Sequence, residues 1–142
     1  MEASKILIEK LKEFEGLRLE AYQDAAGVMT IGYGQTGSDV RKGDRITAYC
    51  ATELLKDDLG KFEAAVRRLH VAKTQGQFDA LVSLAFNIGA VRLQGSTLLK
   101  VIREGGSKRQ ITREFKQWVF AGGRKLSGLE RRREWEVKRF FE

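Results

Sequence analysis

The stretch FEGLRLEAYQDAAGVMTIGYGQTGSDVRKGDRIT, residues 14–47, decides the expected architecture of the chain. Its middle part, residues 21–37, alternates side chains such as Val28, Thr30 and Tyr33 with repeated glycines. Short β-branched and aromatic runs bounded by glycine are typical of a small hairpin or sheet. We therefore expect residues 17–46 to form a small β lobe. Turns or close backbone approaches are expected at its glycines, which are Gly27, Gly32, Gly34, Gly37 and Gly43.

The segment before this stretch has a helical pattern. Residues 5–14 place Leu7, Leu11 and Phe14 on one face. Gly16 follows directly, and a glycine just after the last periodic residue commonly ends a helix. The sequence thus predicts a helix that stops where the β lobe begins.

From Thr47 onward the pattern is helical throughout. Leu55, Leu59, Phe62 and Val66 lie on one face of a long helix. The other expected helices are a core helix between a Thr74–Gln77 capping box and Gly89, a short one over about 96–103, one from Ser107 that carries Ile111, Phe115 and Trp118 and stops at Gly122-Gly123, and a last one from Ser127 with Glu130 completing a capping box.

These elements predict an α+β fold that is predominantly α. We expect one domain over residues 1–142, with an N-terminal helix and β lobe over 1–46 and a helical lobe over 47–142. A cleft between two such lobes is a natural place for a site.

Composition excludes several classes of function. Cys50 is the only cysteine and His70 the only histidine, so an intrachain disulfide and a two-histidine metal site are both impossible. We expect no cofactor and no metal. No stretch approaches the ~20 apolar residues of a membrane span, and the charged first fourteen residues lack a signal-peptide core. The expected location is the cytoplasm until the chain is released.

The net charge of +7 is concentrated toward the C-terminus. Residues 107–142 hold 11 Lys/Arg against 5 Asp/Glu, whereas residues 1–106 hold 15 against 14. Such a basic third favours a polyanionic partner, which could be nucleic acid, a membrane surface or an anionic cell wall. The alternative is a solvated basic face that only aids solubility.

The chain contains no proline, although average usage predicts roughly seven. One hypothesis is that the sequence is designed rather than natural. A genomic reading frame that encodes it would refute that hypothesis.

Three polar residues lie around the junction of the first helix and the β lobe: Glu15, Asp24 and Thr30. Hydrolysis of a glycosidic bond needs a carboxylic acid that protonates the leaving oxygen and a second carboxylate. A glutamate against apolar neighbours such as Leu19 or Phe14 is desolvated and keeps its proton, whereas an aspartate in a wetter loop stays ionised. The alternative is that Glu15 pairs with an arginine and Asp24 caps a turn.

Longer motifs favour the catalytic interpretation. The run over residues 14–47, the segment LLKDDL, the segment QGQFDALVSLAFNIG and the pattern W-x-x-A-G-G-x-x-L-x-G-L-x-x-R-R-x-x-E from Trp118 follow one another along the chain. Together they resemble the phage lysozymes, the muramidase family of T-even and lambdoid phage endolysins (glycoside hydrolase family 24). The resemblance covers nearly the whole chain.

The resemblance implies a lysozyme fold and cleavage of the β-1,4 bond between N-acetylmuramic acid and N-acetylglucosamine in peptidoglycan. By the motif match, Glu15 is the general acid, Asp24 activates a water and Thr30 positions that water. The implied outcome is inverting, for which the two carboxyl groups lie about 6.5–9.5 Å apart, against about 5–5.5 Å in retaining enzymes.

The resemblance also implies substrate contacts, at Gly34 in the β lobe and at Phe86 and Thr97 in the helical lobe. One position departs from the family pattern GYGHT, because Gln35 stands where the histidine is usual. We expect this change to lower stability rather than remove the chemistry, since glutamine keeps only a neutral hydrogen bond.

Other conspicuous residues have structural explanations. We expect Trp118 and Trp135 in the core, Cys50 buried and inert, and His70 at the end of the long helix without a catalytic role. The run of Arg131, Arg132 and Arg133 is either a solvated basic face or the source of an arginine that pairs with Glu15.

Two other classes of function remain open beside an active muramidase. One is a cell-wall binder with a crippled site, and the other is a nucleic-acid-binding helical domain suggested only by the charge. The expected partner is peptidoglycan. We expect no nucleic acid, no stable membrane insertion, and a monomer.

Overall fold

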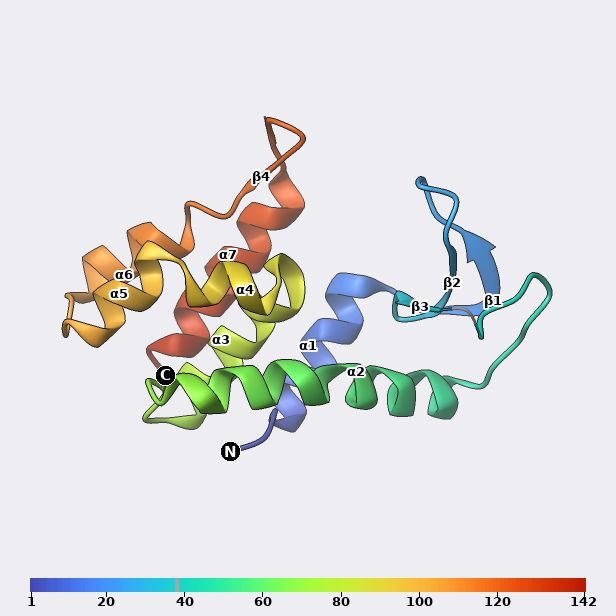
Figure 1. Cartoon of the computed structure of the whole chain (residues 1–142), viewed down its shortest axis with the longest axis horizontal. Helices are drawn as coiled ribbons and strands as arrows, with labels where there is room; N and C mark the ends of the chain where they lie inside the picture. The colour runs from blue at the N-terminus through green and yellow to red at the C-terminus, as the bar shows by residue number, and fades with distance from the viewer. Residues whose placement is uncertain (38) are drawn as a thin grey trace. The chain divides into compact units, whose positions relative to one another are not determined.

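The structure is a computed structural model that describes residues 1–37 and 39–142 (Figure 1). The chain divides into two compact units, each of which is described by itself. The sheet unit comprises Ile8–Lys61, and the helical unit comprises Met1–Leu7 and Phe62–Glu142. The lobe division at residues 46–47 stays a prediction.

The sheet unit contains most of the first helix, the predicted β lobe and the start of the long helix. Its elements are α1 (Lys5–Glu15, whose first residues belong to the helical unit), β1 (Arg18–Gln23), β2 (Met29–Gly32), β3 (Gln35–Thr36) and the first part of α2 (Ala48–Leu69). The three strands form an antiparallel sheet in the order β1-β2-β3. Tyr22 and Thr36 pair with Thr30 from either side, so Thr30 lies on the central strand.

The helical unit is built around α3 (Gln75–Ile88), as the sequence predicts. Its other elements are α4 (Ala90–Gln94), α5 (Thr97–Arg103), α6 (Lys108–Phe115), β4 (Phe120–Ala121), β5 (Arg124–Lys125) and α7 (Ser127–Phe140). Helix α3 packs chiefly on α7, and its apolar side chains are buried almost all round. This arrangement confirms the fold class, a predominantly helical α+β fold.

Two details of the predicted helix ends are wrong. The helix from Ser107 stops at Phe115, and residues 120–125 form a hairpin instead. Gly122 and Gly123 have φ of +58° and +77°, the left-handed conformations that a two-residue hairpin turn requires. Helix α7 does begin at Ser127, but its N-cap is Leu126, and no side chain caps it.

The N-caps of α3 and α6 are confirmed in part. Ser107 and Gln110 form a complete capping box at α6. The Thr74 side chain accepts from the Gln77 N–H at α3, but the Gln77 side chain reaches back to the N–H of Lys73 rather than Thr74. The predicted capping box at α3 is therefore incomplete, because the Gln77 side chain bonds to the N–H of the residue before the N-cap.

Cys50 is exposed, so the expectation of a buried thiol is wrong. Its backbone N–H donates to the Thr47 hydroxyl oxygen at 3.1 Å, at the start of α2. Trp118 and Trp135 are half-buried, and His70 is exposed with φ +54° just after α2. Among the helices of residues 1–37 and 39–142, none combines the length and apolar composition that crossing a bilayer requires.

Candidate active site

Glu15 is the last residue of α1. Gly16 follows with φ +72°, and its N–H donates to the Lys12 carbonyl at 2.9 Å, which ends the helix as predicted. The Glu15 side chain is exposed, and Leu19 is 46% exposed. The expected desolvation of the carboxyl against apolar neighbours is therefore wrong, because Glu15 itself is exposed.

Asp24 follows β1 and organises the turn that leads into β2. Its Oδ1 accepts the N–H groups of Ala26 and Val28, both at 2.9 Å. Its backbone N–H donates to the Val28 carbonyl at 2.9 Å, so the turn is closed from both sides. Within the described part of the chain, no protein hydrogen bond engages Oδ2. Asp24 thus caps a turn with one oxygen and keeps the other for solvent or substrate.

Thr30 is linked to Asp24 through one shared backbone residue. The Thr30 side chain is 4% exposed, and its Oγ1 donates to the Val28 carbonyl at 3.0 Å. Because Val28 also donates its N–H to Asp24 Oδ1, the carboxyl and the hydroxyl are held by the same peptide segment. The sheet register therefore brings two of the three predicted catalytic residues together.

The third residue, Glu15, meets the turn between β2 and β3. Gly34 has φ +95°, and a Cβ built on it would lie 3.8 Å from Glu15 Oε2. The turn backbone therefore passes close to the carboxyl, and a side chain at Gly34 would stand beside it. This places the predicted substrate-contact residue Gly34 at Glu15.

Gln35 fixes the conformation of that turn. It is 6% exposed, its Oε1 accepts the Tyr33 N–H at 2.8 Å, and its Nε2 donates to the Tyr33 carbonyl at 3.4 Å. A Cβ at Gly32 would lie 2.8 Å from Gln35 Oε1, so only glycine leaves room for the amide. The glutamine thus keeps neutral hydrogen bonds, and both are to the backbone of Tyr33 in the same turn.

Phe86 and Thr97, the other two predicted substrate contacts, belong to the helical unit. Phe86 is half-buried on α3, with its ring edge-on to Phe62 at 5.4 Å between centroids. Thr97 is the exposed first residue of α5, directly after the Ser96 cap. Both have surface available for a ligand.

Of the three consecutive C-terminal arginines, Arg131 is exposed and the other two are not part of a solvated face. Arg132 and Arg133 are buried, and Arg133 Nε lies 2.7 Å from Glu136 Oε1. The two Nη atoms of Arg133 donate to the Trp118 carbonyl at 3.0 Å and to Asn87 Oδ1 at 2.8 Å. These partners of the Arg133 guanidinium all belong to the helical unit. Pairing of Glu15 with one of the other two arginines stays a prediction.

Burial dominates the electrostatics of this network. It raises the pKa of Glu136, although Arg133, a hydrogen bond from the Ser83 hydroxyl and Arg132 all act in the opposite direction. Burial also lowers the pKa of Arg133, against the attraction of Glu136. Sequence reasoning missed this network, for which the available signal was a serine on the otherwise apolar face of α3.

The fold is lysozyme-like. The model of the Phage lysozyme family matches residues 12–136, and the chain belongs to that family.

The relatives of this chain include endolysins. The endolysin of Bacillus phage B103 is 42% identical over 144 residues, which cover 99% of this chain and 54% of that protein. The chain thus spans about half the length of this relative and of the endolysin of Bacillus phage PZA. The endolysin of Salmonella phage P22 is 47% identical over 105 residues, covering 70% of this chain and 72% of the endolysin.

Solved structures have the same fold. The muramidase domain of SpmX from Asticcacaulis excentricus superposes with a TM-score of 0.89 at 39% identity, covering 99% of this chain and 98% of that one. A variant of the lysozyme of P22 superposes with a TM-score of 0.88 at 40% identity, covering 100% and 99%.

Proposed function

We propose that the chain is a muramidase that hydrolyses the β-1,4 bond between N-acetylmuramic acid and N-acetylglucosamine in peptidoglycan. The observation that carries the proposal is the shared attachment of Asp24 and Thr30 to Val28, with Asp24 Oδ2 left for water. Family membership and endolysin relatives support the substrate class.

In the proposed reaction, Glu15 donates its proton to the glycosidic oxygen. The Thr30 hydroxyl already donates to the Val28 carbonyl, so toward a water it acts as an acceptor. A water that donates one proton to Thr30 Oγ1 and the other to Asp24 Oδ2 directs a lone pair outward. Asp24 takes up a proton as the water oxygen bonds to C1, and the sugar–oxygen bond breaks.

This chemistry predicts inversion at C1, so the first product from a β bond is the α anomer. Proton NMR of the fresh reducing ends distinguishes the two anomers. Initial release of the β anomer would mean that Asp24 or another group forms a covalent intermediate, and the assigned role of Asp24 would be wrong.

The decisive test is Glu15→Gln, assayed by the release of reducing ends from purified cell walls. A general acid contributes about 10²–10⁴ in rate, so we expect a loss of this size with the fold unchanged. Glu13→Gln is the matched control, because Glu13 is exposed on the same helix and, among the described residues, is hydrogen-bonded by the Lys10 side chain alone. Equal rates for Glu15→Gln and the parent chain would refute the assignment.

Asp24→Asn tests the second carboxylate. The amide keeps an oxygen that can accept the Ala26 and Val28 N–H groups, so the turn is retained while the base is lost. We expect a loss of about 10² or more. Asp44→Asn is the control, because Asp44 Oδ2 accepts the Arg41 N–H in a comparable exposed turn. If Asp24→Asn is as active as Asp44→Asn, then Asp24 is only a turn cap.

Substrate contacts are proposed at Gly34, Phe86 and Thr97. Gly34→Ala adds a methyl group beside the Glu15 carboxyl and is expected to raise KM and lower kcat. Phe86→Ala and Thr97→Ala are expected to raise KM chiefly. Unchanged KM in both of the latter variants would exclude the two residues from the substrate site.

We further propose that the chain acts as a monomer, without cofactor, without nucleic acid and without stable insertion into membranes. Sedimentation and vesicle-leakage measurements test the first and last points. Synthesis in the cytoplasm, followed by release to the wall, stays a prediction.

A further inference from the structure

The whole net charge of the protein lies on one quarter of its sequence. Residues 91–126 contain nine Lys/Arg and two Asp/Glu, a net of +7, whereas the remaining residues contain 17 of each sign. All nine basic side chains are exposed. Within the described residues, only Arg113 and Lys125 of the nine lie within 4.0 Å of a carboxylate, and both contacts are 3.8 Å or longer.

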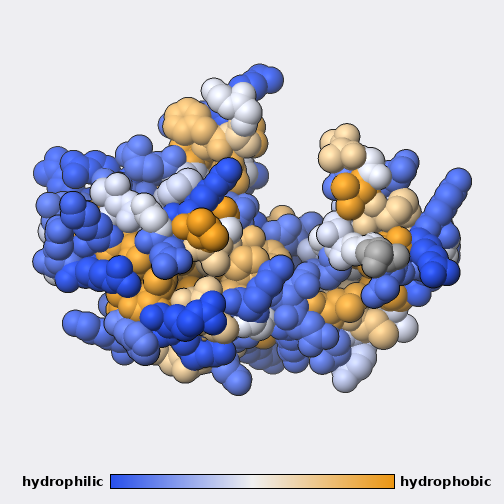
Figure 2. Space-filling model, viewed as in Figure 1, coloured by the Kyte–Doolittle hydropathy of each residue, from blue (hydrophilic) through white to orange (hydrophobic). Residues whose placement is uncertain are grey.

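Five of these cations gather where α5 ends and α6 begins. This surface, which we call the basic corner, comprises Lys100, Arg103, Lys108, Arg109 and Arg113. Helices α5 and α6 pack on each other, so the residues of the basic corner come from two neighbouring helices (Figure 1). Figure 2 shows hydrophilic side chains covering this end of the unit.

A hollow of about 400 Å³ borders the basic corner at Arg103. His70, Lys73 and Arg103 lie among its lining residues, with an apolar floor that includes Ile102 and Phe140. No aspartate or glutamate lines it within the described part of the chain. An anion at this position would therefore meet positive charge without a competing carboxylate.

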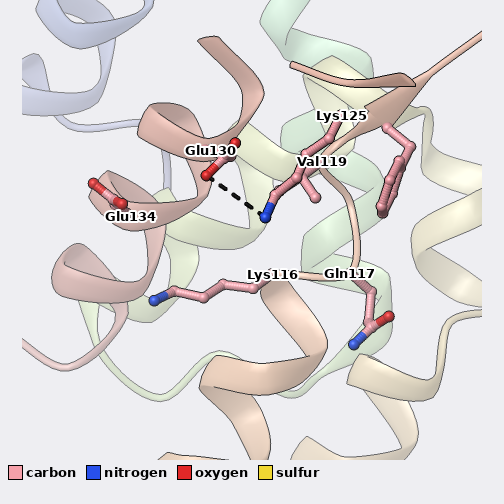
Figure 3. A pocket seen from close by; sticks show the side chains of 7 residues that line it. Lys116, Gln117, Val119, Lys125, Glu130 and Glu134 are labelled. Atoms are coloured by element: carbon pink, nitrogen blue, oxygen red, sulfur yellow. Dashed lines mark ion pairs between the residues drawn. The ribbon is translucent and has the colours of Figure 1, made fainter. Parts of the chain in front are cut away.

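A second hollow of the helical unit shows the contrast. It measures about 380 Å³ and lies between the end of α6, the β4–β5 hairpin and α7 (Figure 3). Its two lysines are matched by two glutamates, and Lys125 Nζ points to Glu130 Oε2 at 3.9 Å. The excess of positive charge is thus a property of the basic corner and not of every hollow in the unit.

We infer that the basic corner binds a linear, phosphate-rich anionic polymer of the cell wall and holds the enzyme on its substrate. This inference rests on the proposed wall hydrolysis, since the wall carries both the peptidoglycan substrate and the phosphate-rich polymer. Charge complementarity selects the partner, because repeated phosphodiester groups match cations spread over two helices. Among the described residues 100–113, none has a large exposed apolar side chain of the kind that inserts into a membrane interface.

The test compares binding to walls before and after their phosphodiester polymers are removed with hydrofluoric acid. Glu15→Gln is used as the background, so that the walls are not degraded during the measurement. The corner variant replaces Lys100, Arg103, Lys108 and Arg109 by glutamine. The matched control replaces four exposed cations outside the corner, Lys42, Arg45, Lys56 and Arg68, by glutamine and so has the same net charge.

We expect the corner variant to bind intact walls at least about tenfold more weakly than the control. If each of the four cations contacts a phosphate, the slope of log Kd against log salt falls by about 3, at ~0.7 per contact. On stripped walls the two variants should bind alike. Arg103 also donates to the Leu69 carbonyl at 3.4 Å, so a triple variant that keeps Arg103 serves if the quadruple variant does not fold.

Three outcomes would overturn the inference. The first is equal binding of the corner and control variants to intact walls. The second is that the corner variant binds stripped walls more weakly than the control by the same factor as it does intact walls. The third is a preference for duplex DNA or for phosphatidylglycerol vesicles over the wall polymer that depends on the corner. Failure of the proposed function is distinguishable by a separate assay. If the function is wrong, the chain with Glu15 intact releases no reducing ends from stripped walls, whatever the binding result.

Discussion

The two units differ in the kind of polar side chain that they bury, which is neutral in one and mostly charged in the other. Among the described residues of the sheet unit, the buried polar side chains are the neutral Thr30 and Gln35, and each hydrogen-bonds to backbone of its own strand or turn. In the helical unit, buried charged groups tie α3 to α7. The ties join Asp79 to Arg139, Ser83 to Glu136 and Asn87 to Arg133.

The difference follows from what each unit has to do. A carboxylate that exchanges protons with water and substrate has to stay accessible, and both predicted catalytic carboxyls lie in the sheet unit outside its core. A buried carboxylate that already accepts several hydrogen bonds is unavailable for such exchange, but it fixes the elements that supply the donors. The comparison teaches that the carboxylates predicted to be catalytic stay accessible in one unit, whereas the buried carboxylates of the other are structural ties.

The largest effect that tests this comparison is expected for Arg133→Met. The substitution leaves the Glu136 carboxyl buried without its 2.7 Å partner, which costs about 3–5 kcal/mol in the free energy of unfolding. Urea denaturation measures the change. Arg113→Met is the control, because its 3.8 Å pair with Glu114 lies at the surface and is worth less than about 1 kcal/mol.

The same variant makes a prediction about pH. Burial already raises the pKa of Glu136, and loss of Arg133 raises it further. A carboxyl with a raised folded-state pKa stabilises the fold below the pKa of the unfolded chain, about 4.3, and this contribution is lost as pH rises. Arg133→Met should therefore lose more stability near neutral pH than in mild acid. A pH-independent loss would mean that Glu136 is not the group left unpaired.

The second effect concerns the N-terminal segment. Asp79 is buried and accepts hydrogen bonds from the Ser4 backbone and hydroxyl, from Gln75, and from Arg139 Nε and Nη2 at 3.0 and 2.8 Å. Asp79→Ala removes all of these acceptors at once and should cost about 3 kcal/mol. The ties of residues 1–7 to α3 and those of α7 to α3 are lost together.

Hydrogen exchange gives the sharper measurement for Asp79→Ala. The amides near residues 4–7 should exchange faster relative to those of β2, because the tie belongs to the helical unit alone. Asp57→Ala, at an exposed position of α2, should leave both unchanged. Equal acceleration in the two units would show that they unfold as one, and the contrast drawn between them would then carry no energetic weight.

Much of this was predictable from local pattern. The alternation of residues 28–33 and their glycines predicts the sheet, and the helical spacing of Leu55, Leu59 and Val66 predicts the long helix. Residues near in sequence carry both signals. The Asp24–Val28–Thr30 arrangement is equally local, so a motif match over a few residues suffices to find it.

The rest depended on contacts between distant segments. Nothing in the local sequence pairs Ser83 with Glu136, which are 53 positions apart, or Ser4 with Asp79, which are 75 apart. The run of three arginines looks solvated because charge usually is, and only the packing of α7 on α3 buries two of them. Gly122-Gly123 predicts a helix stop from the sequence but forms a hairpin turn, since glycine pairs occur in both.

The third effect tests how the sheet unit holds its turn. Gly32→Ala places a Cβ 2.8 Å from Gln35 Oε1 at φ +68°, and the strained backbone together with the displaced amide should cost about 2 kcal/mol. Adding Gln35→Ala removes the steric part but not the backbone strain. The double variant should therefore lose less than the sum of the two single losses. Strict additivity would show that the Gln35 amide does not occupy the space beside Gly32 in solution.

The smallest effect is expected for Gly16→Ala. Gly16 has φ +72°, and a Cβ there meets nothing within 4 Å, so the cost is that of the left-handed backbone alone, about 1 kcal/mol. The end of α1 also directs Glu15, so the substitution should lower kcat while KM stays near its value. Gly27→Ala is the matched control, with φ +80° and equally open space, but in the turn after Asp24. If both variants lower kcat alike, the turn at Asp24 is as sensitive as the helix end. If neither variant lowers kcat, the backbone after Glu15 can shift without affecting catalysis, and this contradicts the role assigned to Glu15. The hydrogen bonds around the two carboxyls would then constrain the sheet unit less than the structure implies.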